Sequence, residues 1–190
     1  MIHDGGDREL RGSDLLPSLG YHTRGERLGA SPTVVPDLAV GLEGTVDGEA
    51  VTLDMLIEVD RTGRGAYNAK KFAAYDQFLG GWCTRTSDFK NGRPLVVFIA
   101  HEARAIPSLM AAADPVMTLG YGAPGVYDEK EFDYPGRGHT AFTCMHWLLA
   151  GYGHAMRLPD LPPGLRDYEH RMETELVALL PEGWWPAKAC

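Results

Sequence analysis

Two runs of alternating apolar and polar residues, 33–46 and 49–60, flank the dipeptide Asp47-Gly48. Alternation with a period of two is typical of half-buried β-strands. An Asp-Gly dipeptide between two such runs indicates a two-residue turn that joins antiparallel strands. The pattern therefore predicts a long β-hairpin over residues 33–60.

The two-residue turn also fixes which residues of the predicted hairpin face each other. Facing residue numbers add up to 95 if no bulge interrupts the strands, so Asp37 is opposite Glu58 and Val35 is opposite Asp60. We therefore expect Asp37, Glu58 and Asp60 on one face, with the Cβ atoms of the facing acids about 4.5–5.5 Å apart. The other face of the second strand is apolar and consists of Leu53, Met55, Ile57 and Val59.

Helical and extended patterns alternate along the rest of the chain. Residues 66–82 predict a helix that closes at a Gly-Gly pair, and residues 92–100 predict a strand buried on both faces. A second helix is predicted for residues 102–113, a strand, a helix and a strand for residues 141–158, and an amphipathic helix for residues 165–180. Such alternation indicates an α/β fold.

The length and composition suit one globular domain, because the chain has 190 residues, of which 44% are apolar. We expect a loose lead-in over residues 1–30 with at most one short helix. An α/β core is expected over residues 31–160, followed by a C-terminal amphipathic helix and tail over residues 161–190.

The chain has none of the sequence features that mark export or insertion in a membrane. No apolar run approaches the roughly 18 residues of a membrane-spanning helix, and the polar, acidic first residues do not resemble a signal peptide. Cys83, Cys144 and Cys190 are scattered and do not indicate a disulfide framework. We expect a cytoplasmic protein with no membrane partner.

Charge is distributed unevenly along the chain, whose formal net charge is −8. Residues 61–104 hold 8 Lys or Arg against 3 Asp or Glu, whereas both flanking parts are acidic. The overall acidity argues against sequence-independent wrapping of nucleic acid. The basic block is either an ordinary solvated face or a local phosphate contact made by Arg61, Arg64, Lys70 and Arg85.

The facing carboxylates need a physical reason, because like charges opposite each other destabilise a sheet. A divalent cation turns this repulsion into attraction, and Mg²⁺ and Mn²⁺ prefer carboxylate oxygens, waters and phosphate. Asp37, Glu58 and Asp60 are therefore candidate ligands for Mg²⁺ or Mn²⁺, which would activate a water and neutralise a phosphodiester. Alternatively, Glu58 and Asp60 form a solvated strand end whose charges pair with Arg61 or Arg64.

An amine is also expected near these acids. The predicted helix 66–82 carries a stripe at spacings of four, four, three and four residues, made of Tyr67, Lys71, Tyr75, Phe78 and Trp82. Lys71 lies within this stripe, whereas Lys70 points elsewhere. Because this helix follows the second strand, Lys71 is the candidate to steer the hydrolytic water or to stabilise the transition state.

Three segments together resemble the replication-relaxation family of plasmid and mobile-element proteins. The family pattern is a Pro-Asp strand, a strand that ends in Glu-x-Asp-Arg-x-Thr, and a helix with Lys and, four residues later, Tyr. The chain matches it in VVPDLAV, LIEVDRTG and KKFAAY, with the Arg and Thr one residue closer together. The matching residues are Pro36, Asp37, Glu58, Asp60, Arg61, Lys71 and Tyr75. The segment HTAFTCMHWLLAGYG is similar, more weakly, to the closing strand and helix of that family.

The family is in turn similar to the PD-(D/E)xK nuclease superfamily. The resemblance implies a restriction-endonuclease-like fold over residues 31–160, with a central four-stranded mixed sheet flanked by helices. It also implies a catalytic set of Asp37, Glu58, Asp60 and Lys71 that uses Mg²⁺ or Mn²⁺. The superfamily pattern has its lysine two residues after the acid, where this chain has Asp60, so Lys71 has to supply the amine from the helix.

Three functional interpretations follow. The first is a metal-dependent nuclease, or a nuclease-derived DNA-processing protein, of plasmid or mobile-element replication or transfer. The second is a catalytically silent module of the same fold that binds DNA or a replication or transfer protein. The third is a structural protein that forms homo-oligomers through its C-terminal helix. Family members carry an N-terminal winged-helix domain for which 30 lead-in residues are too few, so we expect DNA binding by this chain alone to be weak.

Overall fold

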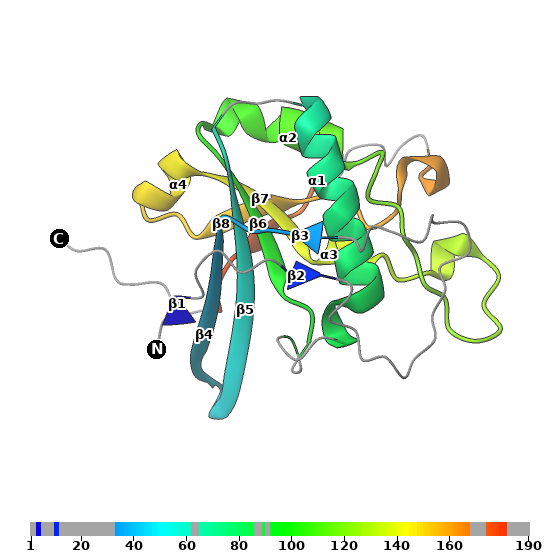
Figure 1. Cartoon of the computed structure of the whole chain (residues 1–190), viewed down its shortest axis with the longest axis horizontal. Helices are drawn as coiled ribbons and strands as arrows, with labels where there is room; N and C mark the ends of the chain where they lie inside the picture. Colours follow the sequence, from blue (N-terminus) through cyan, green and yellow to red (C-terminus); the bar gives the residue numbers. More distant parts are fainter. Residues whose placement is uncertain are drawn as a thin grey trace.

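A mixed, open β-sheet with helices packed against it forms the centre of the molecule (Figure 1). The computed structural model describes residues 3–4, 10–11, 33–61, 65–85, 89, 92–167 and 174–181. Within them the sheet has seven strands in the order β1-β4-β5-β6-β7-β8-β9. Strands β5, β6 and β7 are parallel, and the other neighbouring pairs are antiparallel. The predicted α/β class is confirmed, although the sheet has more strands than the four expected.

The strands of this sheet are β1 His3–Asp4, β4 Leu38–Val46, β5 Glu49–Asp60, β6 Leu95–Ala100, β7 Thr140–Cys144, β8 His154–Arg157 and β9 Leu176–Ala178. A separate pair joins β2, Leu10–Arg11, to β3, Thr33–Val34. The α-helices are α1 Gly65–Gln77, α2 Ile106–Ala113, α3 Pro135–Gly138 and α4 Met145–Leu149. Short 3-10 turns span Cys83–Arg85, Ala103–Ala105, Glu129–Glu131 and Pro163–Leu165.

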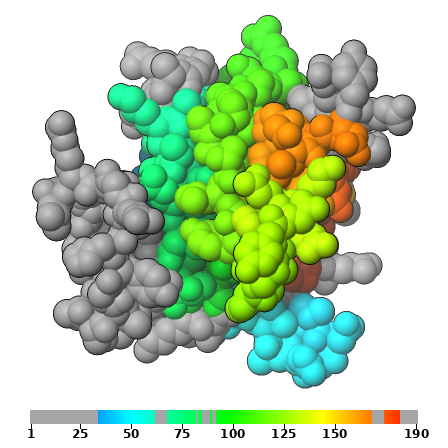
Figure 2. All heavy atoms as spheres, turned by 90° about the vertical axis from the view of Figure 1, so that its right-hand side faces the viewer, coloured from blue at the N-terminus to red at the C-terminus, as the bar shows by residue number. Residues whose placement is uncertain are grey.

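The predicted hairpin is confirmed with its register from residue 38 onwards, but its first strand does not begin at residue 33, because Thr33 and Val34 form the separate strand β3. Leu38 pairs with Ile57 and Val46 with Glu49, so the facing positions along β4 and β5 are those that the two-residue turn predicts. Asp47 and Gly48 both have positive φ, at 52° and 86°, as the tight turn of a twisted hairpin requires. The tip of this hairpin projects away from the body of the molecule, as the cyan atoms of Figure 2 show.

The main core lies between α1, α2 and one face of the sheet. Phe72 and Tyr75 of α1 are buried against Phe98 of β6, with ring centroids 4.5 and 5.8 Å apart. Phe98 in turn stacks on Phe142 of β7 at 5.8 Å. The predicted helix is confirmed, and after Gln77 it continues as one wider π-helical turn, Phe78–Trp82, that contains the Gly-Gly pair. This packing holds α1 along the face of the sheet, with the start of the helix near the carboxyl end of β5 (Figure 1).

The opposite face of the sheet carries a second apolar cluster. Met55, Val97 and Ile99 are buried there, and Leu53 and Ile57 pack against the cluster. This is the apolar face that the alternation in the second strand predicts. Leu56, by contrast, points into the main core below the helices. The carboxylates two and four residues further along β5 share that helix-covered face, which places them next to α1.

The elements predicted between residues 92 and 158 are also confirmed. Strand β6 is buried along nearly its whole length, as expected for a strand between two parallel neighbours. Helix α2 follows it, and β7, α4 and β8 form the predicted strand, helix and strand. In the described part of the chain, no helix is both long enough and apolar enough to cross a bilayer.

The predicted C-terminal amphipathic helix is wrong in the part that the structure describes. Leu165 ends a 3-10 turn, and Leu176–Ala178 form strand β9, which pairs with β8. The short apolar run around Leu176 is compatible with either a helix or a strand. It forms a strand because the edge of β8 offers it hydrogen-bond partners.

Most of the lead-in, residues 1–30, lies outside the described residues. Its described pieces are two short strands, and the expectation of at most one short helix concerns residues outside the described ones. His3 and Asp4 pair with β4, and Leu10 and Arg11 pair with β3.

Asp76, near the end of α1, ties the helix to the segment that follows α2. Its Oδ2 accepts hydrogen bonds of 2.9 Å from the backbone N–H groups of Thr118 and Leu119. Its Oδ1 has no hydrogen-bond partner among the described residues, and a Cβ atom added to Gly136 would come within 2.0 Å of it. Burial raises the pKa of Asp76 to about 6, against the opposing effects of both backbone hydrogen bonds and the charge of Arg137.

Candidate functional site

A pocket opens beside the carboxyl end of β5, on the face of the sheet that α1 covers. Its cavity volume is about 460 Å³. The residues that line it are Asp37, Glu58, Val59, Asp60, Arg61, Asn68, Lys71 and Phe98. All four predicted catalytic residues thus lie around one cavity.

Asp37 is held at the start of β4 by the neighbouring strand. Its Oδ2 accepts a hydrogen bond of 2.7 Å from the backbone N–H of Val59. This side-chain bond continues the hairpin one position beyond the last paired residues, Leu38 and Ile57. Asp37 is therefore next to Glu58, as the register predicts, and its exposed side chain contributes to the wall of the pocket.

Glu58 is the buried acid of the site, with only 2% of its surface exposed. Tyr75 donates a hydrogen bond of 2.7 Å from its hydroxyl to Oε1, and Lys71 forms a salt bridge to Oε2. Burial raises the pKa of Glu58 above its ordinary value. The hydrogen bonds from Lys71 and Tyr75 and the positive charge of Lys71 oppose this increase, whereas the negative charge of Asp37 adds to it. Both oxygens of this carboxylate are thus occupied by groups from α1.

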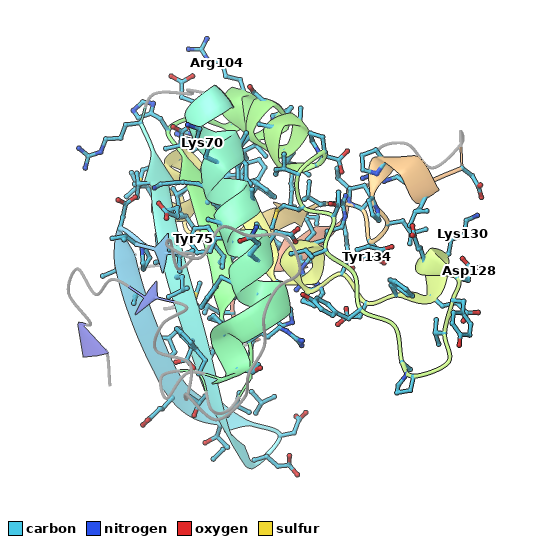
Figure 3. The ribbon with its side chains drawn as sticks, turned by 45° about the vertical axis from the view of Figure 1, so that its right-hand side comes forward. Lys70, Tyr75, Arg104, Asp128, Lys130 and Tyr134 are labelled. Carbon is cyan, nitrogen blue, oxygen red and sulfur yellow. The ribbon has the colours of Figure 1, made fainter. Side chains whose placement is uncertain are left out.

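Tyr75 acts as a donor and not as a proton acceptor. Burial and the adjacent Glu58 raise its pKa far above the ordinary value, so the hydroxyl keeps its proton. Figure 3 shows Tyr75 on α1, the helix that lies over the sheet. The predicted stripe on this helix therefore brings two of its members, Lys71 and Tyr75, to the same carboxylate.

Asn68 is a pocket residue that the sequence did not indicate. It lies one turn before Lys71 on α1 and is only 5% exposed. Its Nδ2 finds no hydrogen-bond acceptor in the part of the chain that the structure describes. Asn68 belongs to no motif and carries no charge, so the sequence alone provides no reason to select it. Its spacing of three residues from Lys71 does place both residues on one face of the helix.

The predicted nucleic-acid contacts lie at different places. Asp60 and the exposed Arg61 line the pocket at the end of β5. Lys70 is exposed on α1 (Figure 3). Arg64 and the side chain of Arg85 lie outside the described residues. Of these predicted cations, Arg61 is on the wall of the pocket, and Lys70 is not among the residues that line it.

The donor set fits a divalent cation only with ligands from solvent or substrate. No group of three or more His, Cys, Asp or Glu side chains that could hold a metal ion occurs among the described residues. Asp37 and Glu58 offer carboxylate oxygens, which suit Mg²⁺ and Mn²⁺. Mg²⁺ commonly keeps several waters and takes one or two carboxylates and a phosphate. The residues present match this kind of site, with Lys71 competing for Glu58.

Comparison of the chain with models of protein families, with curated proteins and with solved structures finds no match. The resemblance to the replication-relaxation family therefore rests on the matching segments alone.

Proposed function

We propose that the chain is a nuclease-like DNA-processing protein that hydrolyses a phosphodiester with Mg²⁺ or Mn²⁺. The proposal rests on one observation. The salt bridge between Glu58 and Lys71 lies beside Asp37 in a pocket that is open to solvent. An acidic wall next to an amine attracts a cation and an anionic oxygen at once, which is what a metal-bound phosphate presents.

The order of elements also supports this reading. An antiparallel hairpin, a helix and a parallel strand, β4-β5-α1-β6, follow one another, and the acids lie at the end of the hairpin. This order is compatible with the restriction-endonuclease-like core that the resemblance implies. The matching segments further suggest DNA of a plasmid or mobile element as the substrate.

Each residue of the pocket has a role in this proposal. When bound, Mg²⁺ or Mn²⁺ would supply a Lewis acid that activates water and neutralises phosphate charge. Asp37 and Glu58 would hold the ion, whereas Asp60, the third predicted ligand, lines the pocket but does not form a three-acid metal group with them in the described part of the chain. Asp37 is suited to this because one of its oxygens is anchored to the N–H of Val59, which fixes the orientation of the other.

Lys71 and Tyr75 complete the proposed chemistry. Lys71 would turn from Glu58 towards the attacking water or towards the negative charge that develops on the phosphate. Tyr75 keeps its proton and holds Oε1 of Glu58, so the carboxylate stays oriented while Lys71 moves.

One observation favours a second candidate, a catalytically silent module that binds DNA or a replication or transfer protein. Both oxygens of Glu58 are already occupied by Lys71 and Tyr75, which is the arrangement of a satisfied buried acid. Asp60 also stands where the nuclease pattern has its lysine. In this case the pocket would bind a ligand without cleaving it.

Mn²⁺-dependent cleavage of plasmid DNA by purified protein tests the proposal. Asp37→Asn and Lys71→Ala should each reduce the cleavage rate by about 100-fold or more, because each removes a group that acts on the transition state. Lys130→Ala is the matched control, since it removes a lysine on a loop distant from α1 (Figure 3). Cleavage that survives both site variants would refute the assigned roles.

Binding measurements separate the two candidates. Stabilisation by Mn²⁺ in a thermal shift, abolished by Asp37→Asn and accompanied by no cleavage, would favour the silent module. Absence of any response to Mn²⁺ would count against the metal site itself.

A further inference from the structure

We infer that Asn68 is a substrate-contacting residue whose carboxamide donates a hydrogen bond from Nδ2 to a non-bridging oxygen of the phosphodiester; this inference rests on the proposed function. Neither the predicted catalytic set nor the resemblance includes Asn68. The inference depends on two observations: the position of this buried amide in the pocket wall and the lack of a hydrogen-bond partner for its Nδ2.

A buried polar atom without a partner is costly. Such a group loses its hydrogen bonds to water and gains none in return, so proteins leave few of them. Only 5% of the surface of Asn68 is exposed, and its Nδ2 lacks an acceptor among the described residues. Asn68 nevertheless lines the pocket, and because Nδ2 itself is enclosed, a small turn of the carboxamide would present it to a ligand there. A ligand that brings an acceptor oxygen would satisfy this donor.

The charges around Asn68 indicate the kind of acceptor. The pocket has two chemically different walls. Asp37 and Glu58 come from the strands, whereas Asn68 and Lys71 come from one face of α1. Arg61 adds a second cation at the end of β5. An anionic oxygen is therefore favoured next to Lys71 and Asn68, and a cation next to the carboxylates.

A phosphodiester fits this division better than an uncharged carbonyl. It offers two non-bridging oxygens, one for the cation side and one for the donors of α1. The amide of Asn68 adds no charge, so it can fix the direction of the phosphate without competing with Lys71 for Glu58. This is a positioning contact of the kind that aligns the phosphate with the attacking water.

Asn68→Leu tests the inference, because leucine has a similar shape and no polar atoms. Two quantities are measured with purified protein: Kd for a fluorescein-labelled DNA oligonucleotide with Ca²⁺, and kcat/KM for Mn²⁺-dependent cleavage. We expect Kd to rise and kcat/KM to fall by about 10- to 100-fold, as for loss of a hydrogen bond to a charged acceptor. Because Nδ2 has no acceptor among the described residues, loss of this donor should leave the melting temperature unchanged or raise it.

Thr140→Val is the matched control. Thr140 on β7 is fully buried and its Oγ1 also lacks a partner among the described residues, but it is not part of the pocket wall. This variant should leave Kd and kcat/KM unchanged. Asn68→Ala provides the same test if leucine proves too large for the site.

The outcomes separate the inference from the proposed function. Wild-type protein that neither binds nor cleaves DNA overturns both. Wild-type protein that binds or cleaves, with Asn68→Leu and Asn68→Ala doing so equally well, overturns the role of Asn68 alone. Loss of binding together with a matching loss of thermal stability would also overturn it, because the amide would then be a structural element.

Discussion

Asp76→Asn should change how the stability of the protein depends on pH. Asp76 is 2% exposed, and burial raises its pKa from 3.8 to about 6. The asparagine amide keeps an oxygen that can accept from the N–H groups of Thr118 and Leu119, but it cannot titrate. The variant therefore removes the proton equilibrium while it retains the two backbone hydrogen bonds.

The sign follows from proton linkage. Between about pH 4 and pH 6 the folded protein holds a proton on Asp76 that the unfolded chain has released. The contribution of Asp76 to stability is therefore fully present below pH 3.8, falls as the pH rises through about 6 and stays low above it. At about 1.4 kcal/mol per pH unit, the change of pKa from 3.8 to about 6 corresponds to roughly 3 kcal/mol.

Urea denaturation of wild type and Asp76→Asn at several pH values between 4.5 and 8 measures this effect. The free energy of unfolding of wild type minus that of the variant should decrease by about 2 kcal/mol across the range. A constant cost from the new amide group shifts the whole curve and does not alter its slope. Asp160→Asn removes an exposed carboxylate and serves as the control for charge. Parallel curves for wild type and Asp76→Asn would refute the reasoning.

Three further changes test the packing around α1. Lys71→Met should lower the free energy of unfolding by roughly 2 kcal/mol at pH 8 and by less at pH 5, because it leaves the buried Glu58 charge without its cation; equal losses at both pH values would contradict this. Tyr75→Phe should cost about 2 kcal/mol in urea denaturation by removing the hydrogen bond to Oε1 of Glu58, and no loss would show that bond to be unimportant. Gly136→Ala should cost about 1–3 kcal/mol, since the added Cβ would come within 2.0 Å of Asp76 Oδ1, whereas Gly138→Ala, with no atom near its Cβ, should be close to neutral.

The hairpin and its acids could be predicted because their signals are local. Asp47-Gly48 fixes the turn, the turn fixes the register, and the register brings Asp37 beside Glu58 without further information. The stripe on α1 similarly indicates Lys71, because residues three or four positions apart lie on the same face of a helix. In each case a few neighbouring residues contain the whole constraint.

The features that the sequence did not predict correctly depend on contacts between distant segments. The strand at Leu176 exists because the edge of β8, some twenty residues earlier, offers it a partner, and no pattern within 165–180 contains that information. Asn68 was missed for a related reason. Its significance comes from the cavity that Asp37 and Phe98 help to enclose, and these residues are distant from it in sequence.

Glu58 and Asp76 show how a functional buried acid can be told from a structural one. Both are 2% exposed, Glu58 lies against α1 and Asp76 belongs to it, and burial raises the pKa of each. Asp76 is closed in by backbone, with Gly136 so near that no ligand could approach its Oδ1. Glu58 borders an open cavity together with Asn68, whose Nδ2 lacks a partner among the described residues. Burial and a raised pKa do not distinguish the two acids. Glu58 is chosen as the functional acid because its pocket has space for a ligand and contains a donor, Nδ2 of Asn68, that a ligand could satisfy.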